Sequence, residues 1–288
     1  MRRRVFLCGL IVLPAAVLAT HVAPPAAEDS VRFAVIGDSG TGSTGQYELA
    51  RQLTDARQVF PFTFVLMMGD NLYGGESPRD YDEKFELPYQ ALLAAGVPFY
   101  ATLGNHDDPS ERLYRPFHMD GRRYYAFTKG AVAFFVMDST YMDRAQLDWL
   151  EGALATSTAR WKIAYAHHPL YSSGARHGSE LDLRALVEPL FVRYGVDVVL
   201  AGHEHFYERV RPQQGVYYFT SGAAGKLRKG DIRRSILTAA GFDQDLSFML
   251  MEVAGDVLYF QAVSRTGAIV DAGTLERPAD PEGPGTSR

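Results

Sequence analysis

Short apolar segments of this chain repeatedly end in a glycine followed by a side chain that can bind a metal ion. The clearest case is the run 62–68, which reads as a fully buried strand of an α/β sheet. Gly69 and Asp70 follow it directly, and Tyr73 comes three residues later. A carboxylate at the end of a strand can bridge two cations, and a phenolate is a ligand for a hard trivalent ion. Alone, these residues are better explained by a turn with a helix-capping aspartate and a half-buried tyrosine.

The same arrangement recurs after other apolar segments. Loops at the carboxyl ends of strands in an open α/β sheet converge on one crevice, so the polar side chains of these loops should meet. Two Asp, one Tyr, one Asn and three His would supply seven ligands, with one carboxylate shared between two metals that each keep an open position. A lone histidine near a strand end is more often structural, so the prediction depends on the whole set: Asp38, Asp70, Tyr73, Asn105, His167, His203 and His205.

The order of strand and helix patterns indicates the fold class. Alternating strands and helices give way to a strand-rich last third, which predicts a four-layer α/β/β/α sandwich of two mixed sheets flanked by helices. The metal site is expected at the carboxyl ends of the strands. Expected strands are 31–37, 62–68, 97–103, 124–129, 131–138, 161–166, 196–201, 216–220, 246–253 and 257–263, and expected helices are 46–57, 82–95, 143–155 and 181–194.

The first 27 residues have the pattern of an export signal followed by a linker. Arg2, Arg3 and Arg4 precede an apolar run that is too short for a comfortable transmembrane helix. The order Arg3-Arg4 also resembles a twin-arginine signal, although an ordinary secretory signal explains the same residues. The single cysteine, Cys8, lies in this segment, so the mature protein would have no disulfide and no cysteine ligand. We therefore expect a periplasmic or secreted protein.

The rest of the chain is expected to form one catalytic domain over residues 30–274, with a disordered tail over 275–288 that is rich in Pro, Gly and charge. The formal net charge of −5 provides no general attraction for nucleic acid or an anionic membrane. We expect a monomer that acts on a small phosphoester, with no nucleic-acid partner and no membrane contact beyond the export signal.

The five ligand-bearing segments resemble the ordered motifs of the calcineurin-like metallophosphoesterases, and among them the purple acid phosphatases of the short, tartrate-resistant type. The motifs Gly-Asp-x-Gly, Gly-Asp-x-x-Tyr, Gly-Asn-His-Asp, Val-x-x-His and Gly-His-x-His correspond to 37–40, 69–73, 104–107, 164–167 and 202–205, with Ala164 in place of Val. Most metallophosphoesterases carry a metal-binding His two places after the first Asp. Here that place is Gly40, and Tyr73 supplies the ligand instead, as in the purple acid phosphatases.

The resemblance implies a division of the ligands between two metals. Asp38, Tyr73 and His205 would hold Fe(III), and Asp70 would bridge. Asn105, His167 and His203 would complete the site of a divalent ion, which could be Fe, Zn or Mn. The resemblance also implies that His106 and His177 are catalytic and that both, with Asn105, contact the substrate; an exposed loop residue is the alternative for His177.

Two metals would clamp the phosphoryl oxygens and lower the pKa of a bound water from ~15.7 to about 7 or below. A metal-bound hydroxide would then persist at acidic pH and act as the nucleophile, while His106 assists phosphoryl binding or protonates the leaving group. This predicts an exported acid phosphatase that hydrolyses phosphate monoesters. A phosphodiesterase or nucleotidase on the same metals, or a non-hydrolytic iron-binding redox protein, remains an alternative.

Residues beside the ligands are interpreted less specifically. His168 is expected to form a wall of the pocket, and Asp107 to orient His106. Tyr171, Tyr207 and Arg209 are expected on loops that shape substrate entry. A basic segment is interpreted as solvated surface, with attraction of phosphate as the alternative: Lys226, Arg228, Lys229, Arg233 and Arg234.

Overall fold

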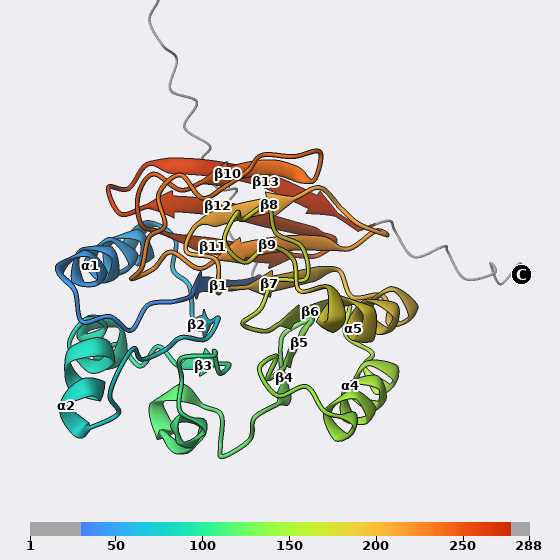
Figure 1. The fold of residues 1–288 in the computed structure, drawn as a ribbon, viewed down its shortest axis with the longest axis horizontal. Helices are drawn as coiled ribbons and strands as arrows, with labels where there is room; N and C mark the ends of the chain where they lie inside the picture. The colour runs from blue at the N-terminus through green and yellow to red at the C-terminus, as the bar shows by residue number, and fades with distance from the viewer. Residues whose placement is uncertain (1–29, 278–288) are drawn as a thin grey trace, which may run out of the picture.

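A computed structural model describes residues 30–277. Two mixed sheets pack face to face, with helices on the outer sides, which confirms the predicted four-layer fold (Figure 1). The six-stranded sheet has the order β13 (Ile269–Glu276), β12 (Val257–Ser264), β11 (Ser247–Ala254), β1 (Val31–Ile36), β2 (Phe64–Met67) and β3 (Phe99–Ala101). The seven-stranded sheet has the order β10 (Thr238–Phe242), β8 (Tyr207–Val210), β9 (Tyr217–Ser221), β7 (Val198–Ala201), β6 (Trp161–Tyr165), β5 (Val132–Val136) and β4 (Tyr125–Lys129).

The parallel strands bring the ligand loops together. β1, β2 and β3 are parallel neighbours in one sheet, and β5, β6, β7 and β9 are parallel neighbours in the other. Backbone hydrogen bonds join the loops that follow them: Asp38 N donates to Gly69 O at 3.0 Å, and Gly202 N donates to His167 O at 2.9 Å. The metal-binding segments therefore meet at one rim, as expected for the carboxyl ends of such strands.

The main hydrophobic core lies between the two sheets. Phe33 and Phe64 of the first sheet stack at 5.3 Å, and Phe134 of the second sheet meets Phe33 edge-on at 5.4 Å. A second cluster packs the seven-stranded sheet against α4 (Arg144–Thr156) and α5 (Leu181–Tyr194). Burial on both faces explains why β2, β5 and β7 read as continuous apolar runs rather than alternating ones.

Three of the four predicted helices form close to their expected bounds. Ser43 caps α1 (Thr44–Val59) by accepting a hydrogen bond from Gln46 N, and Asp143 caps α4 in the same way. The expected single helix 82–95 is wrong. That region contains α2 (Pro78–Tyr81), a π-helical turn η1 (Asp82–Glu86) and α3 (Gln90–Ala94). Pro88 lies in the break, because proline cannot donate the backbone hydrogen bond that a continuous helix requires.

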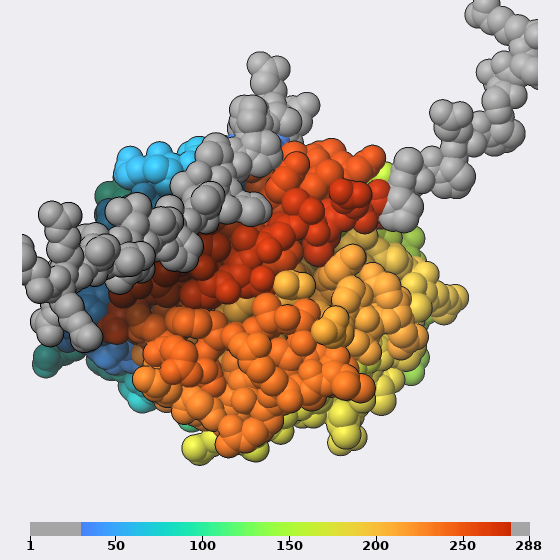
Figure 2. Space-filling view, turned by 90° about the horizontal axis from the view of Figure 1, so that it is seen from above, coloured from blue at the N-terminus to red at the C-terminus, as the bar shows by residue number. Residues whose placement is uncertain are grey.

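Connections and chain ends add details that the patterns did not predict. Short 3₁₀ turns, η2 (Pro109–Leu113) and η3 (Arg115–Phe117), follow the third ligand loop. β13 continues through Glu276, two residues past the expected domain boundary at 274. The expected export signal over 1–27 and the tail from 278 onward lie outside the described residues. Within 30–277, no helix has the length and apolar character needed to cross a bilayer. Figure 2 shows the face built by the C-terminal third, with β13 beside the segment that contains β10.

Candidate metal centre

The first group of predicted ligands consists of Asp38, Tyr73 and His205. The Tyr73 hydroxyl donates to Asp38 Oδ1 at 3.1 Å and lies 3.4 Å from His205 Nε2. His205 Nε2 is 3.3 Å from the same carboxylate oxygen. Three ligand atoms from three distant segments thus face one point, with the geometry expected around a single ion.

The second group consists of Asn105, His167 and His203. Asn105 Oδ1 lies 3.0 Å from His167 Nε2 and 3.0 Å from His203 Nδ1, and the two histidine nitrogens are 3.2 Å apart. The other nitrogen of His167, Nδ1, lies 2.8 Å from Met68 O, which is an acceptor only. This contact places the proton of His167 on Nδ1 and leaves Nε2 free to bind a metal.

Asp70 lies between the two groups. Its Oδ1 is 3.4 Å from His167 Nε2, and it also forms a cluster of possible metal ligands with Asp38 and His205. The backbone N–H of His106 donates to the same oxygen at 3.0 Å, which holds the carboxylate in place. Asp70 is therefore positioned to be shared by two ions.

The backbone at three of the ligands is strained. Asp38, Asp70 and His203 have φ angles of 54°, 51° and 67°, in the left-handed region that side-chain-bearing residues rarely adopt. Each follows a glycine that lets the loops approach closely. At Gly202, for example, an added Cβ would lie 2.7 Å from Asp38 Oδ2. Such strain costs about 1–3 kcal/mol per residue and is typical of functional sites.

The charges of the centre favour bound cations. Burial and the nearby Asp70 raise the pKa of the Asp38 carboxyl well above its usual value. Burial and the neighbouring histidines lower the pKa of His203 to about 2, and burial together with Arg228 and Lys226 lowers that of His205 to about 3. The donor set thus combines two carboxylates that lie close together with imidazoles that stay neutral. No protein group in this set supplies the positive charge that the carboxylates need. Metal ions fit this set because they supply the missing charge.

The Tyr73 hydroxyl would need a bound cation in order to ionise at this position. Burial, Asp38 and Asp70 raise the pKa of its hydroxyl far above the usual value, so this site alone would keep the phenol protonated. A trivalent ion bound to the oxygen would reverse this preference, because it stabilises the phenolate directly.

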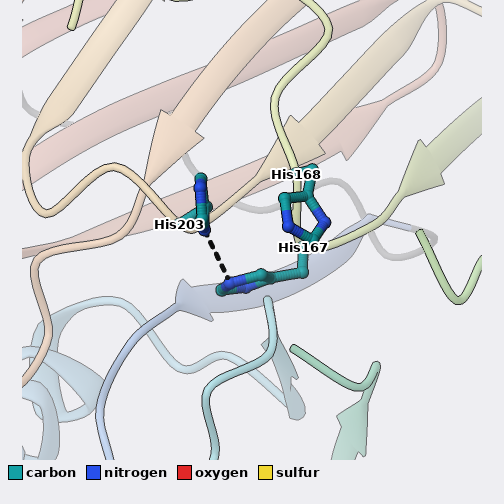
Figure 3. A group of neighbouring side chains, drawn as sticks. All are labelled: His167, His168 and His203. Carbon is teal, nitrogen blue, oxygen red and sulfur yellow. Dashed lines mark hydrogen bonds between the residues drawn. The ribbon is translucent and has the colours of Figure 1, made fainter. Parts of the chain in front are cut away.

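His168, expected in the wall of the pocket, lies beside His167 and His203. In Figure 3 the dashed line joins His203 to His167, while the His168 ring lies alongside them. His168 Nδ1 lies 2.9 Å from Ser139 Oγ, and its ring is 4.4 Å from that of His203. His168 also forms a potential three-histidine cluster with the other two. Asn105 Oδ1 lies 3.0 Å from both His167 Nε2 and His203 Nδ1, so Asn105 remains the expected third ligand of this group.

Two further histidines lie beside the ligand groups. His106 is exposed, and its ring lies 5.1 Å from the Tyr73 ring. His177 is also exposed, and its ring lies 4.4 Å from that of His203. The structure thus brings both predicted catalytic residues beside the centre, one next to each metal-binding group.

Glu204 is a residue of the site that sequence reasoning missed. It is fully buried, and its carboxylate accepts hydrogen bonds from Gly178 N at 2.7 Å and from the Ser172 hydroxyl, and it pairs with Arg228 at 3.2 Å. Gly178 adjoins His177, so Glu204 fixes the loop that carries this histidine. A glutamate between two histidine ligands at the end of a buried strand was the signal that could have identified it.

Several residues beside the motifs have other roles than expected. Asp107 does not contact the His106 ring; it accepts hydrogen bonds from Gly104 N, Leu72 N and the Asn71 amide and so joins two ligand loops. Tyr207 and Arg209 lie on β8, not on loops, and both bind Asp271 of β13. The Tyr171 hydroxyl donates to Glu188 of α5. These contacts join Tyr207 and Arg209 to the other sheet and Tyr171 to α5.

The basic segment divides into two parts. Lys226 and Arg228 are half-buried and face the metal ligands, contrary to the solvated-surface interpretation, whereas Lys229, Arg233 and Arg234 are exposed as expected. The Lys226 ammonium lies 3.4 Å from the centre of the Tyr73 ring. Positive side chains therefore border the first metal-binding group.

Glu111 is a buried carboxyl group near Asp107, and its burial predicts that stability depends on pH. It is buried, and neither carboxylate oxygen has a hydrogen-bond partner among the described residues. Burial, followed by Asp107 and Glu76, raises its pKa to about 11 from an ordinary value of 4.5. The folded protein therefore holds a proton that the unfolded chain releases, so stability falls as the pH rises between these two values.

Glu111→Gln should remove this dependence because an amide cannot ionise. Between about pH 6 and 9, the wild type should lose about 1 kcal/mol of unfolding free energy per pH unit relative to the variant. Urea denaturation at several pH values measures the difference. Parallel curves for the two proteins would show that Glu111 is ionised in the folded state.

Comparisons with known proteins agree with this geometry. The sequence profile of the calcineurin-like phosphoesterases matches residues 31–207. Purple acid phosphatase 17 of Arabidopsis thaliana is 26% identical over 300 residues, covering 86% of this chain and 88% of that protein. Tartrate-resistant acid phosphatase type 5 of Oryctolagus cuniculus is 28% identical over 253 residues, covering 72% and 78%. The structure of a purple acid phosphatase from yellow lupin (Lupinus luteus) seeds superposes with a TM-score of 0.73 at 18% identity, covering 86% of this chain and 54% of that one, and shows the same fold.

Proposed function

Because the chain belongs to the calcineurin-like phosphoesterases, we propose that it is an exported acid phosphatase that hydrolyses phosphate monoesters at a centre of Fe(III) and a divalent ion. The resemblance to the purple acid phosphatases drawn from the five motifs is confirmed by the relatives at 26% and 28% identity. Export to the periplasm or the medium follows from the arginine-rich N-terminal segment and is part of the proposal.

One observation carries this function: two groups of ligand atoms share Asp70, and a histidine lies beside each group. Asp38, Tyr73 and His205 would hold the trivalent ion, and Asn105, His167 and His203 the divalent one. The bound ions would neutralise the phosphoryl oxygens and activate a water molecule. A redox or storage protein would need the ligands but has no use for the two exposed histidines.

The remaining steps belong to the chain itself. His106 and His177 lie outside the ligand groups, where their imidazoles can hydrogen-bond the phosphoryl oxygens or donate a proton to the leaving oxygen. Asn105 would orient the substrate as well as bind the divalent ion. Water activated beside a trivalent ion stays ionised in acid, so the pH optimum should be acidic. A maximum well above pH 8 would contradict this proposal, and a panel of mono- and diesters decides the substrate class.

Tyr73→Phe tests the iron assignment. The purified protein should contain iron and a second metal and should absorb in the mid-visible range, because a phenolate bound to Fe(III) donates charge to the metal. Removal of the phenol oxygen should abolish this band and reduce the iron content. Metal analysis and a visible spectrum measure both. An unchanged band in the variant would show that another group is responsible for the colour.

His177→Ala tests the role of the flanking histidine. We expect kcat/KM for p-nitrophenyl phosphate to fall about 10²-fold, in the range for loss of a general acid–base group. The two-metal content should remain, because His177 is not among the ligands. Arg176→Ala, at the exposed neighbour on the same loop, is the control and should retain activity. Equal rates for the two variants would rule out a catalytic role for His177.

A further inference from the structure

The segment 222–228 is attached to the metal-binding loops at three points. Ala224 N donates to Gly37 O at 3.0 Å, Lys226 N donates to Asp38 O at 3.1 Å, and Arg228 N donates to His205 O at 2.9 Å. The contact is close enough that a Cβ at Gly225 would lie 2.1 Å from Ser39 O. The backbone of Lys226 is therefore held by the same loops that carry two ligands of the first group.

This attachment places the ammonium of Lys226 over the face of the Tyr73 ring. Its Nζ lies 3.4 Å from the ring centre, whereas the other cation–ring distances in the described part of the chain are 4.3 Å or more. Among residues 30–277, no carboxylate lies within 4.0 Å of Lys226 Nζ, while Arg228 pairs with Glu204 and Asp231. The positive charge of Lys226 is thus directed at the ring and is not neutralised by an acid.

We propose that Lys226 is a positioning residue that acts through Tyr73: its ammonium stabilises negative charge on the phenolate and so weakens electron donation from this ligand to the trivalent metal. The proposal rests on the proposed function, because it requires Tyr73 to bind iron. A cation over an aromatic face is attracted by the ring electrons, and this attraction increases when the ring is a phenolate and the site is shielded from water.

The consequence can be measured in the visible spectrum. Charge transfer moves an electron from the ring to the metal and removes negative charge from beneath the ammonium, so Lys226 raises the energy of this transition. It also makes Fe(III) easier to reduce, because the phenolate compensates the metal charge less. Removal of the cation should shift the band to longer wavelength, by about 10–30 nm if the loss is of cation–π size.

The experiment compares the holoprotein with Lys226→Gln, Lys226→Arg and Lys229→Gln. Lys229 is the matched control, because it is an exposed lysine in the same segment. We expect a red-shifted band and a lower reduction potential in Lys226→Gln, recovery of most of the shift in Lys226→Arg, and no change in Lys229→Gln. Circular dichroism and metal analysis confirm that each variant is folded and loaded.

Other outcomes would overturn the proposal. If the band of Lys226→Gln stays at its original wavelength while Tyr73→Phe loses it, the iron assignment stands and the role of Lys226 is wrong. A raised KM with an unchanged band would instead identify Lys226 as a substrate-binding cation. If Lys226→Gln binds no iron, the Lys226→Arg variant provides the test, because it keeps a positive charge at this position. A folded Lys226→Arg protein that has lost the visible band would contradict the proposal that the charge of Lys226 tunes the band. A wild type without any visible band would refute the iron assignment itself.

Discussion

Asp70→Asn should lower kcat/KM for phosphate monoesters by about 10³-fold or more, equivalent to at least about 4 kcal/mol of transition-state stabilisation. Asp70 is the residue that both ligand groups approach, with its Oδ1 3.4 Å from His167 Nε2 and its carboxylate in the cluster of Asp38 and His205. An amide has one neutral acceptor oxygen and cannot bridge two cations as a carboxylate does. Metal content should therefore fall below two ions per chain.

The control for this substitution is Asp120→Asn. Asp120 is an exposed residue with a φ of 51°, equal to that of Asp70. The substitution therefore places asparagine in the same left-handed backbone conformation but leaves the metal site unchanged. Asparagine tolerates this left-handed conformation, so both variants should fold. Elemental analysis and steady-state kinetics measure the effect. An Asp70→Asn protein with two metals and full activity would mean that Asp70 does not bridge.

Gly40→Ala should destabilise the protein by about 2–4 kcal/mol and abolish most activity. An added Cβ at this position would lie 1.8 Å from Asn71 O and 2.7 Å from Leu72 Cα, both of which are backbone atoms. The two loops also bind each other, because Tyr73 N donates to Gly40 O at 2.9 Å. The only relief is to move 69–73 away from 37–40, which displaces Asp70 and Tyr73.

A comparable glycine without this crowding provides the control. Gly152 lies in α4, and a Cβ added there would meet no neighbouring residue within 4 Å, so Gly152→Ala should be neutral or stabilise by about 0.5–1 kcal/mol. Denaturant unfolding measures both variants. The same argument predicts that Gly40→His would not restore the histidine ligand of other metallophosphoesterases. A Gly40→Ala protein as stable as the wild type would show that the two loops separate easily.

The prediction from sequence was most successful where the information is local. Each of the five ligand-bearing segments follows an apolar strand, so the place of Asp38, Asp70 and His203 at the rim could be read from the neighbouring residues. The helix Leu181–Tyr194 was predicted at both ends, because its apolar spacing is regular and Gly195 ends it in a left-handed conformation. The prediction of a single helix was wrong for the interrupted region 78–94 because the local signal there is weak. The helical pattern contains Pro88, and tertiary packing overrides it.

The order of ligands and their chemistry were thus determined by the sequence itself, because strand, glycine and ligand are adjacent along the chain. Only the tertiary structure decided how these groups face one another and what surrounds them. Tyr73 and His205, 132 positions apart, meet at 3.4 Å, Glu204 holds the loop of His177, and Lys226 lies over the Tyr73 ring. Such contacts depend on how closely separate loops pack against each other. A local pattern of residues does not predict the distance between two loops that are far apart in the sequence.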